Sequence, residues 1–135
     1  MGIDFGMKRT GIAVTDELQI IASGLTTVET QDIFSFLDKY FKEEEVETVV
    51  VGLPKRMNND DSLVEEHIQQ FINRFKNSFP LIHLERQDER FTSKLAVKTM
   101  IDSGLNKKKR QNKALIDEIS ATIILQSYME RRRFI

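Results

Sequence analysis

Residues 48–54 read Thr-Val-Val-Val-Gly-Leu-Pro, and this stretch decides the fold class. Its apolar side chains are consecutive rather than alternating, which is typical of a strand covered on both faces in a parallel sheet. Gly52 and Pro54 close the run, because proline lacks the backbone N–H that a central strand donates. The sequence therefore predicts an α/β protein with helices on both faces of a sheet.

Strand-like and helix-like patterns alternate on both sides of this stretch. The predicted strands cover residues 1–5, 9–15, 19–28, 48–53 and 81–85. The predicted helices cover residues 30–44, 62–77, 92–104 and 115–131. Thr30 is the expected N-cap of the first helix, and Ser62 with Glu65 forms a capping-box pattern for the second. This order predicts a five-stranded mixed sheet in which the first, fourth and fifth strands lie side by side and parallel.

Composition narrows the class of protein. A chain of 135 residues fits one domain, spanning 1–135, and the absence of cysteine excludes a disulfide framework and a Cys-ligated metal site. No apolar run approaches the ~20 residues of a membrane helix, so we expect a cytoplasmic protein with no membrane partner. Net charge is only −1, but residues 29–47 are acidic and residues 106–135 are basic. A local basic face can bind a polyanion despite a neutral total charge.

Four carboxylates fall where a sheet of this kind places its chemistry. Asp4 ends the first strand, and Asp88 and Glu89 follow the fifth; ligands in open α/β sheets bind outside the carboxyl ends of parallel strands. Asp117 lies in an otherwise apolar helix, where a carboxylate is costly unless it is paired or bound to a cation. Taken singly, each has an ordinary explanation: a turn residue, a helix-dipole acid, or an ion pair of Asp117 with Lys113.

Taken together, these acids predict a metal site. Carboxylates that meet at one edge of a sheet raise one another's pKa unless a cation neutralises them. Mg²⁺ is a hard ion that is usually held by one or two carboxylates and substrate phosphates, and two such ions can cleave a phosphodiester bond. We therefore expect Mg²⁺, with Mn²⁺ as an alternative, at Asp4, at Asp117 and at one of the two neighbours Asp88 and Glu89.

Several motifs in this sequence resemble the YqgF family of the RNase H-like superfamily, whose members are described as pre-16S rRNA nucleases and as Holliday junction resolvases. The matching stretches are Gly2-Ile3-Asp4-Phe5-Gly6-Met7-Lys8-Arg9-Thr10-Gly11, Val51-Gly52-Leu53-Pro54, Asp88-Glu89-Arg90-Phe91-Thr92-Ser93, Lys107-Lys108-Lys109-Arg110 and Ile116-Asp117-Glu118-Ile119-Ser120-Ala121. The resemblance implies an RNase H-like fold, and it implies that the family's acidic triad maps onto Asp4, Glu89 and Asp117.

Basic residues near these acids are candidates for phosphate contacts, which bind without reading sequence. The candidates are Lys8, Arg9, Lys55, Arg56, Arg90, Lys107, Lys108, Lys109 and Arg110. Phe91, in contrast, is isolated in the sequence, and we expect it to pack in the core rather than stack on a base.

The leading hypothesis is a metal-dependent endonuclease that trims the 5′ end of pre-16S rRNA. A Holliday junction resolvase, acting on branched DNA as a dimer, uses the same chemistry and is the first alternative. A sugar-kinase-type ATPase shares the Asp4 turn with Gly11 but needs two such domains around its nucleotide. The last hypothesis is a nucleic-acid-binding module that lacks catalysis. RNA is favoured over branched DNA, and the protein is expected to be a monomer or a homodimer.

Overall fold

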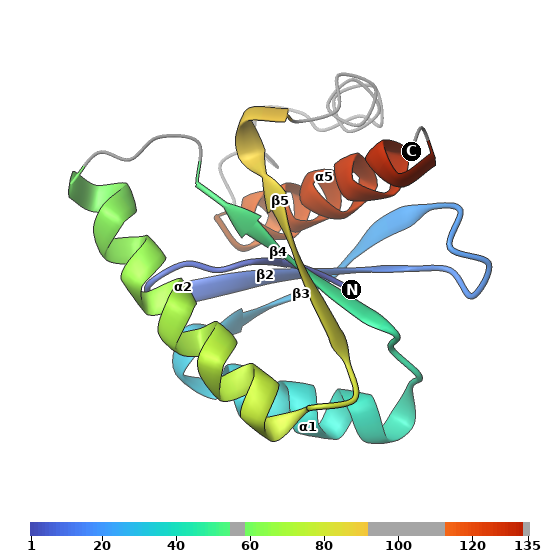
Figure 1. Ribbon diagram of the computed structural model, residues 1–135, viewed down its shortest axis with the longest axis horizontal. Helices are drawn as coiled ribbons and strands as arrows, with labels where there is room; N and C mark the ends of the chain where they lie inside the picture. Colours follow the sequence, from blue (N-terminus) through green and yellow to red (C-terminus); the bar gives the residue numbers. More distant parts are fainter. Residues whose placement is uncertain (55–58, 92–112, 134–135) are drawn as a thin grey trace.

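A computed structural model describes residues 1–54, 59–91 and 113–133. Its strands are β1 (Gly2–Asp4), β2 (Arg9–Thr15), β3 (Ala22–Glu29), β4 (Thr48–Leu53) and β5 (His83–Asp88). They form one sheet in the order β3-β2-β1-β4-β5 (Figure 1). The pairs β1–β2 and β2–β3 are antiparallel, whereas β1–β4 and β4–β5 are parallel. The predicted five-stranded mixed sheet, with its three parallel strands side by side, is confirmed.

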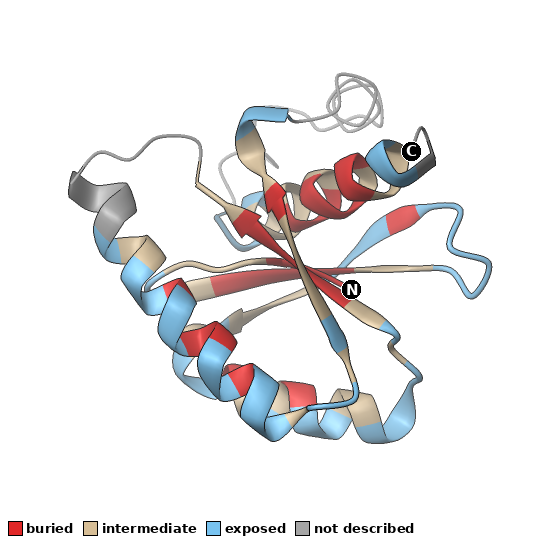
Figure 2. Cartoon of the chain, in the orientation of Figure 1, coloured by how far each residue is buried: buried red, intermediate tan, exposed pale blue. Residues whose placement is uncertain are grey.

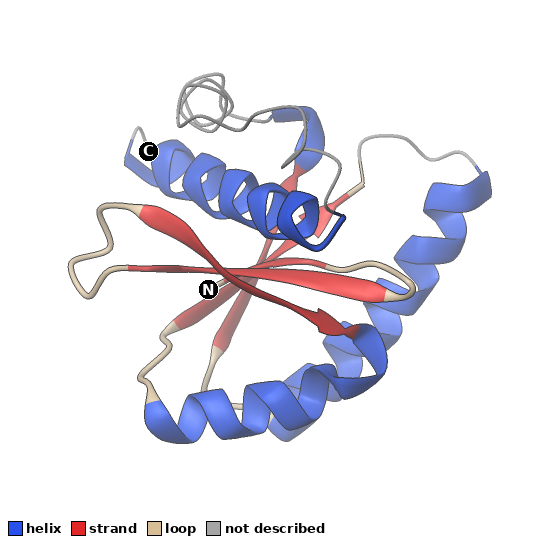
Figure 3. Cartoon of the chain, turned by 180° about the vertical axis from the view of Figure 1, so that it is seen from behind, coloured by secondary structure: helices blue, strands red, loops and turns tan. Residues whose placement is uncertain are grey.

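Helices cover both faces of this sheet, as predicted (Figure 3). On one side lie α1 (Ile33–Glu43) and α2 (Asn59–Ser78), and on the other lies α5 (Lys113–Arg133). Two short 3-10 helices, η1 (Thr30–Asp32) and η2 (Glu89–Phe91), follow β3 and β5. The helix predicted over 92–104 lies outside the described residues. None of the described helices is both long enough and apolar enough to cross a membrane.

Two strand predictions were wrong in position. β5 begins at His83 rather than Leu81 and runs to Asp88, because pairing with β4 sets its register from Thr48–His83 to Leu53–Asp88. β3 begins at Ala22 rather than Gln19, because the Asp16 carboxylate accepts the backbone N–H groups of Ile20 and Ile21 and holds them in a loop.

Both predicted helix caps were also wrong. Thr30 begins η1 rather than capping α1, and its hydroxyl donates to the Gly6 carbonyl at 2.7 Å. α2 begins at Asn59, so Ser62 lies inside the helix. Glu65 accepts hydrogen bonds from the Arg86 guanidinium instead of closing a capping box.

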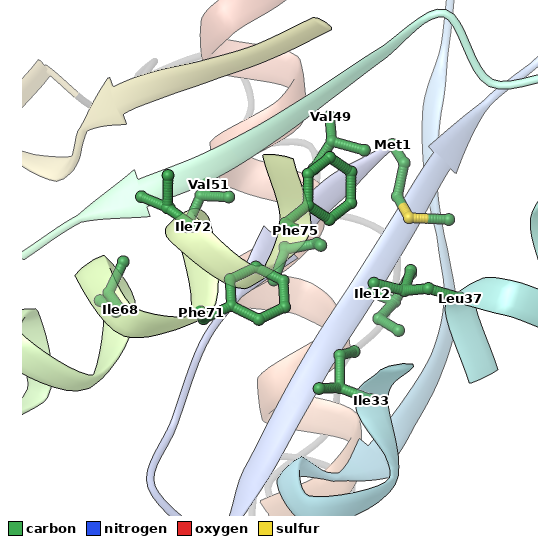
Figure 4. Close-up of a cluster of buried hydrophobic side chains, with 11 residues drawn as sticks. Met1, Ile12, Ile33, Leu37, Val49, Val51, Ile68, Phe71, Ile72 and Phe75 are labelled. Carbon is green, nitrogen blue, oxygen red and sulfur yellow. The ribbon is translucent and has the colours of Figure 1, made fainter. Parts of the chain in front are cut away.

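The core under α1 and α2 is built from large side chains (Figure 4). Phe75 is completely buried, and its ring lies 6.0 Å from Phe71 and 5.1 Å from Phe79. Inward residues of both helices meet alternate residues of β1, β2 and β4, so each helix is buried only along its sheet-facing stripe (Figure 2). The buried members are Met1, Ile3, Ile12, Ile33, Leu37, Val49, Val51, Ile68, Phe71, Ile72 and Phe75.

The face under α5 is built from small residues. A Cβ on Gly2 would lie 2.8 Å from the Ala121 carbonyl oxygen, and a Cβ on Gly11 would collide with the Asp117 carbonyl. Ala13 and Ala121 are completely buried in the same layer. The backbone of α5 therefore comes close to β1 at Gly2 and to β2 at Gly11, while Ile124, Leu125 and Tyr128 fill the rest of this layer.

α5 also reaches the edge strand β3. The Ala22 backbone N–H donates to Gln126 Oε1 at 3.2 Å, and the Thr27 hydroxyl donates to the Ala114 carbonyl. Both ends of the helix are thus tied to the same edge of the sheet.

Candidate active site

Strand alternation places Asp4 on the face that α5 covers. Ile3 belongs to the core under α1 and α2, whereas Gly2 contacts α5. Because successive side chains of a strand point to opposite faces, Asp4 shares the face of Gly2. Asp4 is the last residue of β1, at the carboxyl end of the parallel strands, where the sequence predicted it.

Glu89 and its neighbour Asp88 have different surroundings, since Asp88 ends β5 and Glu89 begins η2. A Cβ on Gly52 would lie 3.5 Å from Glu89 Cδ and 2.7 Å from the Ile124 side chain, so the Glu89 carboxylate lies on the α5 face. Asp88 ends β5, with its side chain at 2.7 Å from Arg90 Nη2, and also accepts the Arg90 backbone N–H. Asp88 therefore holds η2 in place, and the Arg90 pair keeps its pKa below the usual range.

Asp117 is held where α5 approaches β2 most closely. The contact between its carbonyl and Gly11 fixes the helix backbone at this point. The side chain, which is 23% exposed, accepts a hydrogen bond from Arg9 Nε at 3.1 Å. Its ion pair is therefore with the first residue of β2, and not with Lys113 on its own helix.

The three acids interact although 113 residues separate the first from the last. The pKa of Asp4 is raised from 3.8 to about 7, first by burial, then by the negative charges of Glu89 and of Asp117. The structure thus brings together the three predicted residues from a strand end, a 3-10 helix and an α-helix. It does so at the edge of the sheet where ligands of α/β proteins bind.

This donor set has the chemistry of a site for a hard divalent cation. It offers carboxylate oxygens alone, and the pKa of Asp4 is raised first by burial and then by its two acidic neighbours, both of which a bound cation would offset. Within residues 1–54, 59–91 and 113–133, however, no three His, Cys, Asp or Glu side chains are drawn together closely enough to hold a metal ion. The acids face one region, but Asp117 is turned to Arg9.

The predicted phosphate contacts divide into three groups. Lys8 is exposed beside the Asp4 turn, Arg9 is paired with Asp117, and Arg90 is exposed and paired with Asp88. The remaining candidates lie outside the described residues: Lys55, Arg56, Lys107, Lys108, Lys109 and Arg110. The prediction that Phe91 packs in the core was wrong, since its side chain is 67% exposed beside Arg90.

Sequence reasoning missed two residues that support the site. Arg86 donates to both Glu65 oxygens, at 2.8 and 3.0 Å, and to the Gly52 carbonyl at 2.9 Å, which ties α2 to the end of β4 beneath Glu89. Thr30 holds the turn after Asp4 through the Gly6 carbonyl. Arg86 comes directly after the strand predicted over residues 81–85, and a charged residue at that point is a signal that could have been followed. Nothing local marks Thr30.

A cavity of about 350 Å³ lies at the opposite edge of the sheet from the acids. It is lined by the amino ends of β1 and β4, by Tyr40 and Tyr128, and by the acidic residues that precede β4.

Comparison with known proteins agrees with these features. Residues 1–131 match the model of a family described as RuvX, Holliday junction resolvase. A protein of Flavobacterium psychrophilum is 59% identical over 98% of this chain and 96% of its own, and one of Christiangramia forsetii is 60% identical over 96% of each. A protein of Bacteroides thetaiotaomicron is 55% identical over 99% of this chain and 97% of its own. All three carry the name "Putative pre-16S rRNA nuclease".

Proposed function

The chain belongs to the RuvX family, and we propose that it is a metal-dependent endonuclease that processes the 5′ end of pre-16S rRNA. Family membership confirms the resemblance found in the motifs. The observation that carries the proposal is the meeting of Asp4, Glu89 and Asp117 on the α5 face at the carboxyl edge of the sheet. RNA is favoured as substrate because the relatives are named for it.

In this proposal the three carboxylates hold the metal, and nearby cations hold the nucleic acid. A bound Mg²⁺ would activate a water molecule and stabilise the leaving oxygen of the phosphodiester. Lys8, exposed beside the Asp4 turn, binds a phosphate next to the scissile bond. Because Asp4 is buried, water screens its charge less, and its interaction with any cation at the site is stronger.

The test is cleavage of a labelled rRNA precursor by the wild type and three variants, with and without Mg²⁺. Asp4→Asn and Asp117→Asn keep the side-chain shape but remove a ligand charge, so we expect cleavage to fall by about a thousandfold or more. Asp38→Asn removes an equally small acid from an exposed ion pair on α1 and should leave cleavage unchanged. RNA binding, measured by fluorescence polarisation, should not fall in any of the three.

A stability measurement separates a metal site from a structural ion pair. If Asp4→Asn and Asp117→Asn melt several degrees lower and still cut RNA, the metal-site assignment is wrong. Cleavage by wild type that persists in a chelator would exclude the metal. RNA binding without cleavage in any divalent cation would indicate a binding module.

A Holliday junction resolvase remains the second candidate because the matched family carries that description. A labelled four-way junction should be offered in parallel with the rRNA precursor. Symmetrical cuts in the junction, with the precursor left intact, would favour this candidate.

A further inference from the structure

The ion pair between Arg9 and Asp117 occupies one of the three acids proposed for the metal. Arg9 Nε lies 3.1 Å from Asp117 Oδ2, and the two side chains are 37% and 23% exposed. The residues are 108 positions apart, so the pair exists only because α5 is seated on β2. The contact between Gly11 and the Asp117 carbonyl fixes the backbone at one end of the pair.

Arg9 has the more mobile side chain of the two. It begins β2 at the edge of the sheet, its side chain is more than a third exposed, and its long stem can turn toward solvent. Asp117 has a short side chain, and its backbone is held against β2 by the close contact at Gly11. The acid therefore stays near Asp4 and Glu89 whether or not Arg9 contacts it.

We propose that Arg9 is a resident counter-cation, which holds Asp117 in the metal-free protein and is exchanged for the metal on loading. The proposal rests on the proposed function of this site. Released from Asp117, the guanidinium becomes a free donor next to the Asp4 turn and binds a phosphate of the substrate. The arrangement of the three acids explains the exchange: they face one region, yet in the described residues they are not drawn together as ligands.

The exchange is energetically feasible. A partly exposed ion pair is worth about 1 kcal/mol or less, whereas a divalent ion interacts with all three carboxylates at once. Because the same side chain serves first Asp117 and then the substrate, metal binding and RNA binding must favour each other.

The first test is isothermal titration calorimetry of the full chain with Mg²⁺. Arg9→Gln removes the competing cation, and we expect the Mg²⁺ affinity to rise roughly fivefold, the factor equivalent to about 1 kcal/mol. Arg9→Lys, which keeps the charge, should stay closer to wild type. Lys42→Gln is the control, because Lys42 is also exposed and paired with an aspartate, Asp38, but lies on α1. An unchanged or lower affinity in Arg9→Gln, or an equal rise in Lys42→Gln, overturns the proposal.

The second test needs no metal and uses a short RNA of the precursor's 5′ end in a chelator. Arg9→Gln alone should leave the RNA affinity nearly unchanged, because Arg9 is already held by Asp117. Asp117→Ala frees Arg9 and should raise affinity, and the rise should be about threefold smaller in the double variant Arg9→Gln/Asp117→Ala. An equal rise in both backgrounds would mean that only the lost negative charge matters, and it overturns the exchange.

These two tests separate the inference from the function it rests on. If the wild type shows no heat of Mg²⁺ binding, the proposed metal dependence is wrong, whatever the RNA experiment gives. If the wild type binds Mg²⁺ and Asp4→Asn does not, but Arg9→Gln has no effect, only the counter-cation role is wrong.

Discussion

The face of the sheet under α1 and α2 is filled with phenylalanine and branched aliphatic side chains, whereas the face under α5 has glycine and alanine at its contact points. The first arrangement buries a large apolar area and keeps the helices at the distance that their side chains set. The second lets a helix backbone lie on the strands.

The difference matters because only the second face carries the acids. Asp117 reaches Asp4 and Glu89 because Gly11 leaves room for its helix. A bulky layer at this place would keep α5 away from the strands and separate the carboxylates. We therefore expect the face under α1 and α2 to determine mainly the stability of the protein, and the face under α5 to determine mainly the geometry of the site. Substitutions on either face can test this division.

The largest effect is expected on the phenylalanine face. Phe75→Ala should lower the free energy of unfolding by about 3–5 kcal/mol, because it leaves a cavity in a fully buried cluster. Urea unfolding gives the value, and cleavage below the melting temperature should change little. Phe91→Ala is the matched control, since Phe91 is 67% exposed and its loss should not affect stability. A large loss of cleavage in folded Phe75→Ala would contradict the division.

The acidic face should instead make stability depend on pH. The pKa of Asp4 is raised from 3.8 to about 7, so folding favours its protonated form. The stabilisation that protonated Asp4 gives to the folded state is fully present below about pH 4 and is lost as pH rises to about 7. The loss amounts to about 2–4 kcal/mol in the metal-free protein. Asp4→Asn should lack this loss and be more stable than wild type at pH 8 in a chelator. If the free energies of unfolding of wild type and Asp4→Asn differ by the same amount at every pH, this expectation is wrong.

Gly11→Ala tests the close approach directly. The added methyl group meets a backbone carbonyl, so α5 must move away from β2 and carry Asp117 with it. We expect roughly a hundredfold loss of cleavage, the usual effect of a displacement of about 1 Å at a reacting centre. Gly24→Ala is the control, because its Cβ would meet Glu118 Cβ at 3.2 Å, Thr122 Oγ1 at 3.6 Å and the Glu118 carbonyl oxygen at 3.8 Å, contacts that need far less adjustment than the one at Gly11. Equal activities of these two variants would show that the seating of α5 does not position the site.

The smallest effect concerns Thr30, which holds the turn after Asp4 through the Gly6 carbonyl. Thr30→Val removes the hydroxyl that donates to Gly6 and contacts Thr10, and it should cost about 1 kcal/mol of stability. A modest fall in cleavage should accompany it, because the turn after Asp4 loses its support. Thr30→Ser keeps the hydroxyl and should restore both values. If Thr30→Val and Thr30→Ser have the same stability and the same cleavage rate, the Thr30 hydroxyl does not support the turn.

The sequence predicted elements best where the pattern depends on burial. β4 has the predicted bounds, because consecutive valines and Pro54 mark both its character and its end. β5 was misplaced because Arg86 and Gln87 resemble loop residues, and only the ion pair with Glu65 on α2 makes a charged strand residue tolerable. The helix predicted over 92–104 stays a prediction.

The site divides in the same way. Asp4, Glu89 and Asp117 could be grouped from topology, because strand ends at one edge of a sheet must meet. The choice of Glu89 over Asp88 came from the resemblance to the YqgF family, since both acids follow the same strand; in the structure Asp88 pairs with Arg90, and Glu89 lies on the α5 face. The pair of Arg9 with Asp117 joins residues 108 positions apart and depends on a distance between helix and strand that no local pattern encodes.

The bonds from α5 to β3 have a consequence for how molecules of this protein meet one another. An edge strand presents backbone donors and acceptors to which a strand of another chain can add. Here Gln126 takes the Ala22 N–H, and the helix is tied to the outer strand again at Thr27. If α5 moves away from the sheet, Asp117 leaves the proposed site and the edge strand is exposed to strands of other chains at the same time. Loss of solubility would then report on the same displacement as loss of cleavage.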